Sequence, residues 1–183
     1  MSCCKLESER LLLRPLQAED LPTVAKLIGE YDVAKNLSTV PYPYALSDAE
    51  AYYAKHCEKR AKGEDHLFVI ARKGDERLMG QVGLHLKDGI FEMGYWLGKP
   101  YWKLGYATEA AKRAAEFAFR ELKAERIAAG WFRDNPASGH VLAKLGFLPN
   151  GVEERHSIAR GRKVLCNMVE LERVRFGRRR KAA

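Results

Sequence analysis

Residues 93–110 read Met93-Gly-Tyr-Trp-Leu-Gly-Lys-Pro-Tyr-Trp-Lys-Leu-Gly-Tyr-Ala-Thr-Glu-Ala110, and the rest of the chain is organised around them. The stretch predicts a strand, a turn containing Gly105, and the first turn of an alanine-rich helix. Backbone N–H groups without partners point outward at a helix N-terminus, where the helix dipole adds partial positive charge. The turn is therefore a predicted anion-binding site.

The composition indicates one globular domain. The 183 residues are 46% hydrophobic, enough for a substantial core. Apolar runs stay well below the roughly 18 residues of a membrane span, and the first ten residues lack the apolar segment of a signal peptide. The four cysteines show neither C-x-x-C spacing nor a disulfide framework. We expect a cytoplasmic protein without a metal site.

The net charge of +8 is concentrated at the C-terminal end. Residues 172–183 hold six basic side chains against Glu172, so the remainder of the chain is close to neutral. We expect a domain over residues 1–172 and a basic, mobile tail over 173–183. The alternative for the tail is contact with RNA, a ribosome or another acidic surface through Arg178, Arg179, Arg180 and Lys181.

The order of elements predicts an α+β fold. Strands are expected at 8–16, 66–72, 78–86, 90–97, 126–132, 152–159 and 164–171, and helices at 20–31, 47–62, 107–122 and 136–145. Asp20 is expected to cap the first helix, and Ser47 and Glu50 to form a capping box for the second. Runs of strands followed by a β-α-β crossover predict a mostly antiparallel, twisted sheet of 6–7 strands with helices on both faces.

Two segments carry a resemblance to a known family. Residues 101–110 read Tyr-Trp-Lys-Leu-Gly-Tyr-Ala-Thr-Glu-Ala, and residues 135–147 read Asn-Pro-Ala-Ser-Gly-His-Val-Leu-Ala-Lys-Leu-Gly-Phe. Together they resemble the GNAT acetyltransferase superfamily, and within it the branch of ribosomal-protein N-terminal (alanine or serine) acetyltransferases. The resemblance covers about residues 8–171. It implies a single GNAT-like domain, an N-acetyltransferase activity with acetyl-coenzyme A (acetyl-CoA) as donor, no metal, and a homodimer as a family-level expectation.

The resemblance also implies which residues bind the coenzyme. Gly105 would let the backbone approach a pyrophosphate, and Ala107 would avoid crowding it. Lys103 and Leu104 stand where this branch usually has Gly-Lys, which places a bulkier backbone in the first half of the loop. The implied coenzyme-binding residues are Trp96, Leu97, Trp102, Leu104, Gly105, Tyr106, Ala107, Thr108, Asn135 and Ser138.

Direct attack of an amine on a thioester requires a base, stabilisation of an oxyanion and an acid for the leaving thiolate. Leu142 stands where many relatives carry an acid tyrosine, so Ser138 is the predicted acid, although its hydroxyl could equally bond the backbone. Glu92 is the predicted base, because a carboxylate on a central strand is unusual unless it is paired or used. A salt-bridged Glu92 is the alternative, and His66 and His85 are alternative bases.

The acceptor is less specified than the donor. An α-amine with a pKa near 8 needs a weaker base than lysine near 10.4, so we expect a protein N-terminal amine, with a small-molecule amine such as a polyamine as the alternative. The acceptor cleft is expected between the N-terminal helices with loop 36–46 and the strands near 155–163, lined by Tyr42, Tyr44 and Trp96. A catalytically weak module that binds nucleic acid or a ribosome through the basic tail is the competing function.

Overall fold

The computed structural model describes residues 5–181, with side chains to residue 177. One sheet of eight strands runs through it in the order β1-β2-β3-β4-β5-β6-β8-β7. The strands are β1 (Leu6–Glu7), β2 (Leu11–Pro15), β3 (Asp65–Arg72), β4 (Leu78–Lys87), β5 (Ile90–Leu97), β6 (Arg126–Phe132), β7 (Leu148–Ser157) and β8 (Arg162–Glu172). The α+β fold with a mostly antiparallel sheet is confirmed. The strand expected at 8–16 is β2, and the short β1 that precedes it was not predicted.

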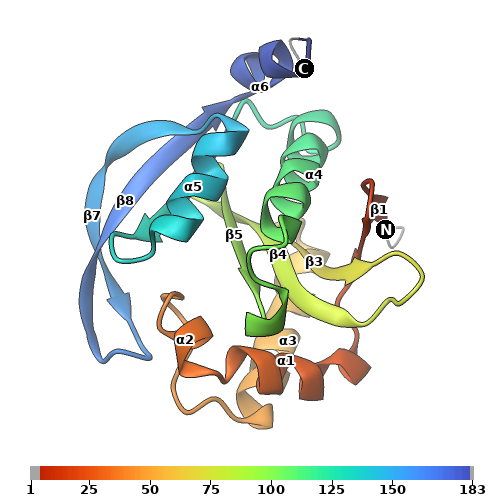
Figure 1. Ribbon diagram of the computed structural model, residues 1–183, viewed down its shortest axis with the longest axis vertical. Helices are drawn as coiled ribbons and strands as arrows, with labels where there is room; N and C mark the ends of the chain where they lie inside the picture. Colours follow the sequence, from red (N-terminus) through yellow and green to blue (C-terminus); the bar gives the residue numbers. More distant parts are fainter. Residues whose placement is uncertain (1–4, 182–183) are drawn as a thin grey trace.

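Helices cover both faces of the sheet (Figure 1). They are α1 (Leu21–Ile28), α2 (Tyr31–Ala34), α3 (Leu46–Ala61), α4 (Tyr106–Arg120), α5 (Pro136–Leu145) and α6 (Arg173–Lys181), with one-turn helices η1 (Ala18–Asp20) and η2 (Lys99–Tyr101). We call the side covered by α4 and α5 the α4 face and the side covered by α1 and α3 the α1 face. No helix within residues 5–181 is long and apolar enough to cross a membrane.

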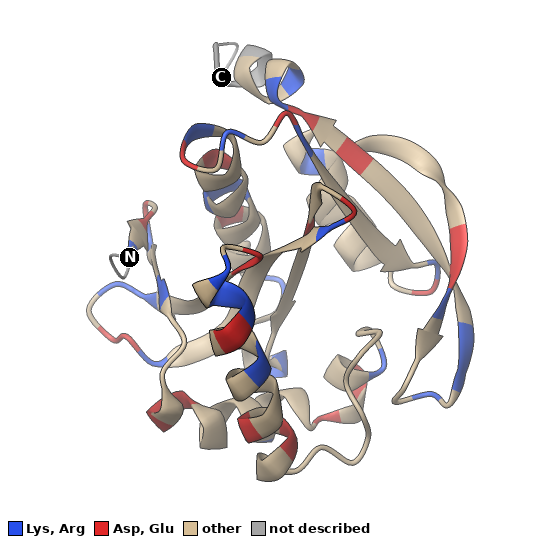
Figure 2. Cartoon of the chain, turned by 180° about the vertical axis from the view of Figure 1, so that it is seen from behind, with Lys and Arg blue, Asp and Glu red and all other residues tan. Residues whose placement is uncertain are grey.

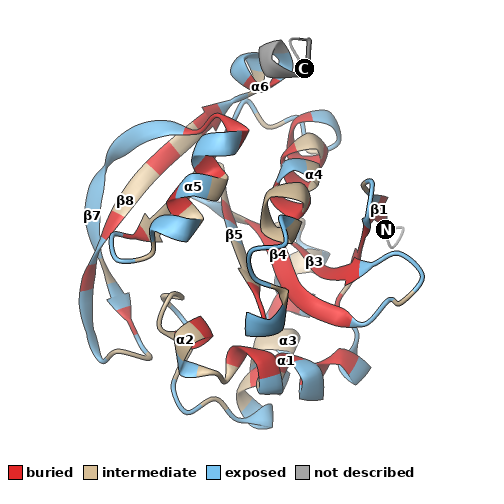
Figure 3. Ribbon diagram, viewed as in Figure 1, coloured by how far each residue is buried: buried red, intermediate tan, exposed pale blue. Residues whose placement is uncertain are grey.

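Alternation along the strands builds a separate core on each face. On β3, Phe68 and Ile70 pack toward the α4 face, whereas Leu67 and Val69 pack toward the α1 face. Figure 3 shows the inner side of α4 buried and β7 largely exposed. The central strands are therefore covered on both sides, and polar residues on them are enclosed by the fold.

The one parallel pair in the sheet, β5 and β6, separates after a short contact. Their register runs only from Phe91 opposite Ile127 to Met93 opposite Ala129, although both strands continue beyond it. In Figure 1, β7 and β8 curve away from the other strands, and α5 lies between them and β5. The edge of β5 from Gly94 onward is thus left without a strand partner on this side, which is where a ligand can take backbone hydrogen bonds.

Two expected helix caps are wrong. The Asp20 carboxylate does not cap α1; it lies 2.7 Å from Nη2 of the buried Arg14, since a buried guanidinium requires a charged partner. The second helix begins at Leu46 rather than after Ser47, and there the Asp48 carboxylate accepts the Ala45 N–H at 2.8 Å.

The expected tail begins with helix α6 rather than irregular chain. Phe176 is 7% exposed and packs on Phe119 of α4, with ring centroids 5.3 Å apart. An aromatic side chain among the arginines thus anchors the helix to the α4-face core. The side chains of Arg178, Arg179, Arg180 and Lys181 lie outside the described residues, so their predicted contact with an acidic surface stays a prediction.

Candidate active site

The turn before α4 has the geometry of an anion site. Gly105, at φ 81°, immediately precedes α4 and leaves the first-turn N–H groups of Tyr106, Ala107 and Thr108 without helical partners. Lys103 lies at φ 62°, in the left-handed region that glycine adopts most easily. Lys103, which stands where this branch usually has glycine, therefore occupies a position at which the backbone favours glycine, and the lysine is strained.

The loop is anchored from its outer side. The Trp102 indole N–H donates to the Leu97 carbonyl at 2.7 Å, and Nη1 of Arg10 donates to the Leu104 carbonyl at 3.1 Å. Nε of Arg10 also pairs with the Glu109 carboxylate at 2.7 Å, and its guanidinium stacks over the Tyr106 ring. Arg10 holds a carbonyl of the turn on the side away from a ligand. Sequence reasoning missed Arg10, because the 94 residues between it and Leu104 leave no local pattern.

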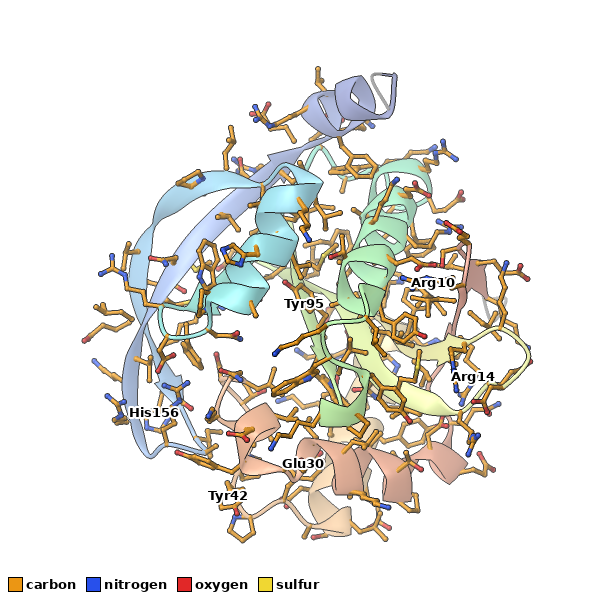
Figure 4. All side chains as sticks on the ribbon, viewed as in Figure 1. Arg10, Arg14, Glu30, Tyr42, Tyr95 and His156 are labelled. Atoms are coloured by element: carbon orange, nitrogen blue, oxygen red, sulfur yellow. The ribbon has the colours of Figure 1, made fainter. Side chains whose placement is uncertain are left out.

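Ser138 lies beside a tyrosine of the central strand. The Tyr95 hydroxyl is 2.9 Å from Oγ of Ser138 and donates to the Ser138 carbonyl at 3.0 Å (Figure 4). Burial raises the pKa of Tyr95, against a smaller opposing effect of the Ser138 hydrogen bond, so the phenol stays protonated near neutral pH. Leu142, which stands where many relatives carry an acid tyrosine, is 1% exposed in the core. No role for Tyr95 was predicted from the sequence; the one signal for it is its hydroxyl, which requires a partner when buried.

The remaining predicted coenzyme residues divide between the two faces. Asn135 precedes α5 and makes no side-chain cap hydrogen bond. Leu97 is buried in the α4-face core, whereas Trp96 packs on the α1 face, where its indole N–H donates to Oε1 of Gln81 at 3.1 Å. The turn and α5 thus come together near the β5 edge, and Trp96 lies on the opposite face.

The predicted base Glu92 is salt-bridged. Both of its carboxylate oxygens accept hydrogen bonds from the Arg155 guanidinium on β7, one at 3.1 Å. Burial alone would raise the pKa of Glu92, but the hydrogen bonds and charge of Arg155 outweigh it and lower the pKa. A lower pKa makes a carboxylate a weaker proton acceptor. The alternative of a salt-bridged Glu92 matches this geometry, and the assignment of Glu92 as the base stays a prediction.

The two alternative histidines face opposite sides. His66 packs between the Phe91 and Phe117 rings on the α4 face, and burial lowers its pKa. His85 lies on the α1 face with Nδ1 2.6 Å from one oxygen of Asp65, whose other oxygen is 2.8 Å from Nδ1 of His56. Burial raises the pKa of Asp65, but the two imidazoles together lower it to about 2.

The β7–β8 hairpin closes onto the N-terminal helices. The Ile158 N–H donates to the Ser38 carbonyl at 3.1 Å, and Nε of Arg160 donates to the Lys35 carbonyl at 2.7 Å. A cavity of about 350 Å³ opens along this seam, and Figure 2 shows basic residues at the hairpin end. Its lining residues are Tyr31, Lys35, Asp134, Arg160 and Arg162.

Of the aromatic residues expected along the acceptor cleft, two come from loop 36–46. Tyr42 is 50% exposed and stacks edge-on against Tyr31, with ring centroids 5.0 Å apart. Tyr44 packs instead against the α1-face core. Tyr42 therefore borders the seam through Tyr31, and Tyr44 contributes to stability.

Residues 10–148 match the family model of the acetyltransferase (GNAT) domain, so the chain belongs to the GNAT acetyltransferase family. It is 28% identical over 169 residues to an uncharacterized N-acetyltransferase, p20, of Bacillus licheniformis, covering 91% of this chain and 94% of that protein. The fold is similar to that of the ribosomal-protein-S5-alanine acetyltransferase from Vibrio fischeri, with a TM-score of 0.79 and 19% identity over 92% of this chain and 96% of that one. It is equally similar to spermidine N-acetyltransferase from Vibrio cholerae, with a TM-score of 0.79 and 21% identity over 92% and 99%.

The predictions of the family, of an N-acetyltransferase and of acetyl-CoA as cosubstrate are confirmed by this membership. The alternative of a nucleic-acid or ribosome-binding module is not supported, because the family match covers the turn and α5. Within the described residues, no three His, Cys, Asp or Glu side chains are grouped as they would be around a metal ion.

Proposed function

We propose that the enzyme acetylates the N-terminal α-amine of a polypeptide. The observation that carries this acceptor class is the charge of the cavity between α2 and the hairpin. There Lys35 pairs with Asp32 and Arg160 pairs with Asp134, so Arg162 adds a positive charge in excess. A polyamine would carry several positive charges into this basic cavity, whereas the carbonyl groups and acidic side chains of a peptide would be attracted. A small uncharged amine is the second candidate.

In this proposal the β5 edge and the turn before α4 hold the donor. The N–H groups of Leu104 to Thr108 bind the pyrophosphate, and the separated edge of β5 takes the amide groups of the pantetheine arm. Ser138, with Tyr95 behind it, supplies the proton to the leaving thiolate. The demand on this acid is modest, because a thiol pKa near 8.5 makes thiolate a good leaving group.

Two measurements test the proposal. Acetyl-CoA at millimolar concentration is expected to raise the melting temperature, since a ligand that binds only the folded state stabilises it. Thiol release is then compared between peptides that begin with alanine or serine and spermidine, and the peptides are expected to be faster. A protein that acetyl-CoA does not stabilise and that acetylates none of these amines would contradict the activity; faster turnover of spermidine would contradict only the acceptor class.

Neighbouring basic residues give a matched pair of variants. Arg162 lines the cavity, whereas the adjacent Lys163 pairs with Glu154 outside it. Arg162→Gln is expected to improve the use of spermidine relative to peptide, because it removes one positive charge from the cavity. Lys163→Gln removes the same charge nearby and is expected to leave the ratio unchanged. Equal effects of the two substitutions would show that the cavity does not select the acceptor.

A further inference from the structure

Two rows of residues cross β3, β4 and β5 in register on the α1 face. The first row is Asp65, His85 and Glu92, which are directly opposed in the two antiparallel pairings. The second row, in the same register, is Leu67, Gly83 and Gly94. Because residues i and i+2 of a strand share a face, the two rows lie side by side.

The second row forms an open floor next to the first. A Cβ added at Gly94 would meet no heavy atom within 4 Å, whereas one at Gly83 would stand 2.8 Å from Nε2 of His85. The His85 ring therefore lies over Gly83, which is directly opposite Gly94 in the pairing of β4 with β5. Gly94 is also the first residue of β5 beyond its pairing with β6. The floor thus borders the point where the donor strand loses its partner.

We propose that His85 is the general base that deprotonates the acceptor amine, and that Asp65 is the residue that positions it. Nδ1 of His85 lies 2.6 Å from the Asp65 carboxylate, and attraction between that carboxylate and an N–H favours the tautomer in which Nε2 carries the free lone pair. Opposed residues in antiparallel strands have Cβ positions about 5 Å apart, so an amine above Gly94 reaches Nε2 directly or through one water. This inference rests on the proposed N-acetyltransferase reaction.

The proton transfers balance. The acceptor ammonium gives one proton to Nε2, and the imidazole, 42% exposed, returns it to solvent. The nitrogen lone pair forms the C–N bond to the thioester carbonyl carbon, and the C–S bond breaks with its electron pair going to sulfur. The thiolate gains a proton from the Ser138–Tyr95 pair, and the second proton lost by the acylated nitrogen returns to that pair through solvent. The products are an amide, a free thiol and one released proton.

Glu92 is a poorer candidate for this role, because Arg155 occupies both of its oxygens. The charged and titratable groups around His85 and Glu92 are Asp65 on β3, His56 on α3, Lys87 on β4, and Arg155 and Glu153 on β7. On the two sides of His85, the Asp65 carboxylate is paired with His56 and the Glu92 carboxylate is paired with Arg155. His85 alone among these groups combines a partner at one ring nitrogen with an accessible second one.

The test compares the pH dependence of kcat/KM for a serine-initiated peptide among the wild type, His85→Gln, Glu92→Gln and His140→Gln. His140 is an exposed histidine of α5 outside this row and serves as the control. We expect the wild type, the control and Glu92→Gln to lose activity as the pH falls through the pKa of the base. His85→Gln is expected to lack this acidic limb and to be about 100-fold slower at pH 7, with acetyl-CoA binding unchanged.

The outcomes distinguish a failure of the proposed function from a failure of the assignment of His85 as the base. A wild type that acetylates no amine contradicts the proposed function, and the base with it. A His85→Gln variant with wild-type rates and an intact limb overturns the base alone, as does loss of the limb in Glu92→Gln. Nitrogen NMR of the neutral His85 ring supplies a readout besides turnover: the proton is expected on Nδ1 in the wild type and not fixed there in Asp65→Asn. A proton on Nε2 in the wild type would overturn the assignment.

Discussion

The α4 face brings backbone and small residues to the candidate site, whereas the α1 face brings charged side chains. On the donor side, the turn at Gly105 and the separated edge of β5 offer N–H groups that carry no net charge. On the proposed acceptor side, Asp65, His85 and Glu92 stand in one row across three strands. The proposed donor site is thus formed by residues that are local in the chain, whereas the proposed proton-transfer site is assembled only by tertiary structure.

The largest expected effect is a loss of acetyl-CoA affinity at the proposed donor side. Gly105→Val forces a β-branched residue to φ 81°, with its Cβ against the Arg10 guanidinium. Because this displaces the turn N–H groups that are predicted to bind phosphate, we expect acetyl-CoA affinity to fall by about 100-fold. Calorimetric titration measures the affinity. Gly89→Val is the matched control, because Gly89 has φ 78° in a hairpin turn with open space around it. Both variants should lose similar stability, and equal loss of affinity in both would contradict the donor site.

The second prediction concerns the acid sensitivity of the acceptor side. The folded pKa of Asp65, about 2, lies below its unfolded value near 3.9, so its contribution to stability is complete above pH 4 and is lost as the pH falls toward 2. Asp65→Asn should therefore cost about 2 kcal/mol at pH 7, and the gap should close between pH 4 and pH 2. Denaturant titrations at several pH values measure it.

An exposed acid provides the control for that measurement. Asp32 also has its pKa lowered to about 2, through hydrogen bonds with Lys35 and Lys99, but its side chain is 41% exposed. Asp32→Asn should have a much smaller effect that high salt removes, because exposed pairs are screened. A deficit of Asp65→Asn that is independent of pH would show that the Asp65 charge does not stabilise the fold.

The third prediction tests the point at which the two sides meet. Ser138→Ala should lower turnover about tenfold while acetyl-CoA affinity is kept, because the hydroxyl assists a leaving group that departs readily without it. Single-turnover kinetics separate the chemical step from binding. Ser47→Ala on the exposed side of α3 is the control. Unchanged turnover in Ser138→Ala would remove the hydroxyl from the mechanism.

The smallest expected effect concerns strain in the donor turn. Lys103→Gly should raise stability by up to about 1 kcal/mol, since glycine relieves the left-handed conformation at φ 62° but adds freedom to the unfolded chain. The melting temperature measures this change, and acetyl-CoA affinity should not decrease. A clear loss of affinity would assign the lysine side chain to the coenzyme site.

The sequence predicted most of the proposed donor side because the residues that form it are contiguous in the chain. Residues 93–110 encode the strand, the turn and the helix start, and Gly105 lies in the left-handed conformation that such a turn needs. Tyr95 was missed as a partner of Ser138, because the two lie 43 positions apart in the chain and no local pattern links them. The predicted helix starts at Asp20 and Ser47 were wrong for a related reason: the Asp20 carboxylate pairs with Arg14, and Asp48, rather than Glu50, accepts the backbone N–H at the start of α3.

The sequence named Glu92 and His85 as candidate bases, but their pairing with other side chains could not be predicted, because it depends on strand register. His85 meets Asp65 and Glu92 only once β3, β4 and β5 are aligned, and shifting one strand by a residue would place His85 on the other face. Arg155 reaches Glu92 from β7, 63 residues along the chain. A single sequence shows that Glu92 is an unusual residue for a central strand, and the fold shows what it is paired with.

Hydrogen exchange of the backbone amides with and without acetyl-CoA tests the central claim most directly. The account predicts that the coenzyme slows exchange at two places, the turn and first helical residues at 104–108 and the β5 edge at 94–96, while amides of β2 and β3 stay unchanged. Protection confined to other segments, or none at saturating acetyl-CoA, would contradict the assignment of the donor to the separated edge of β5.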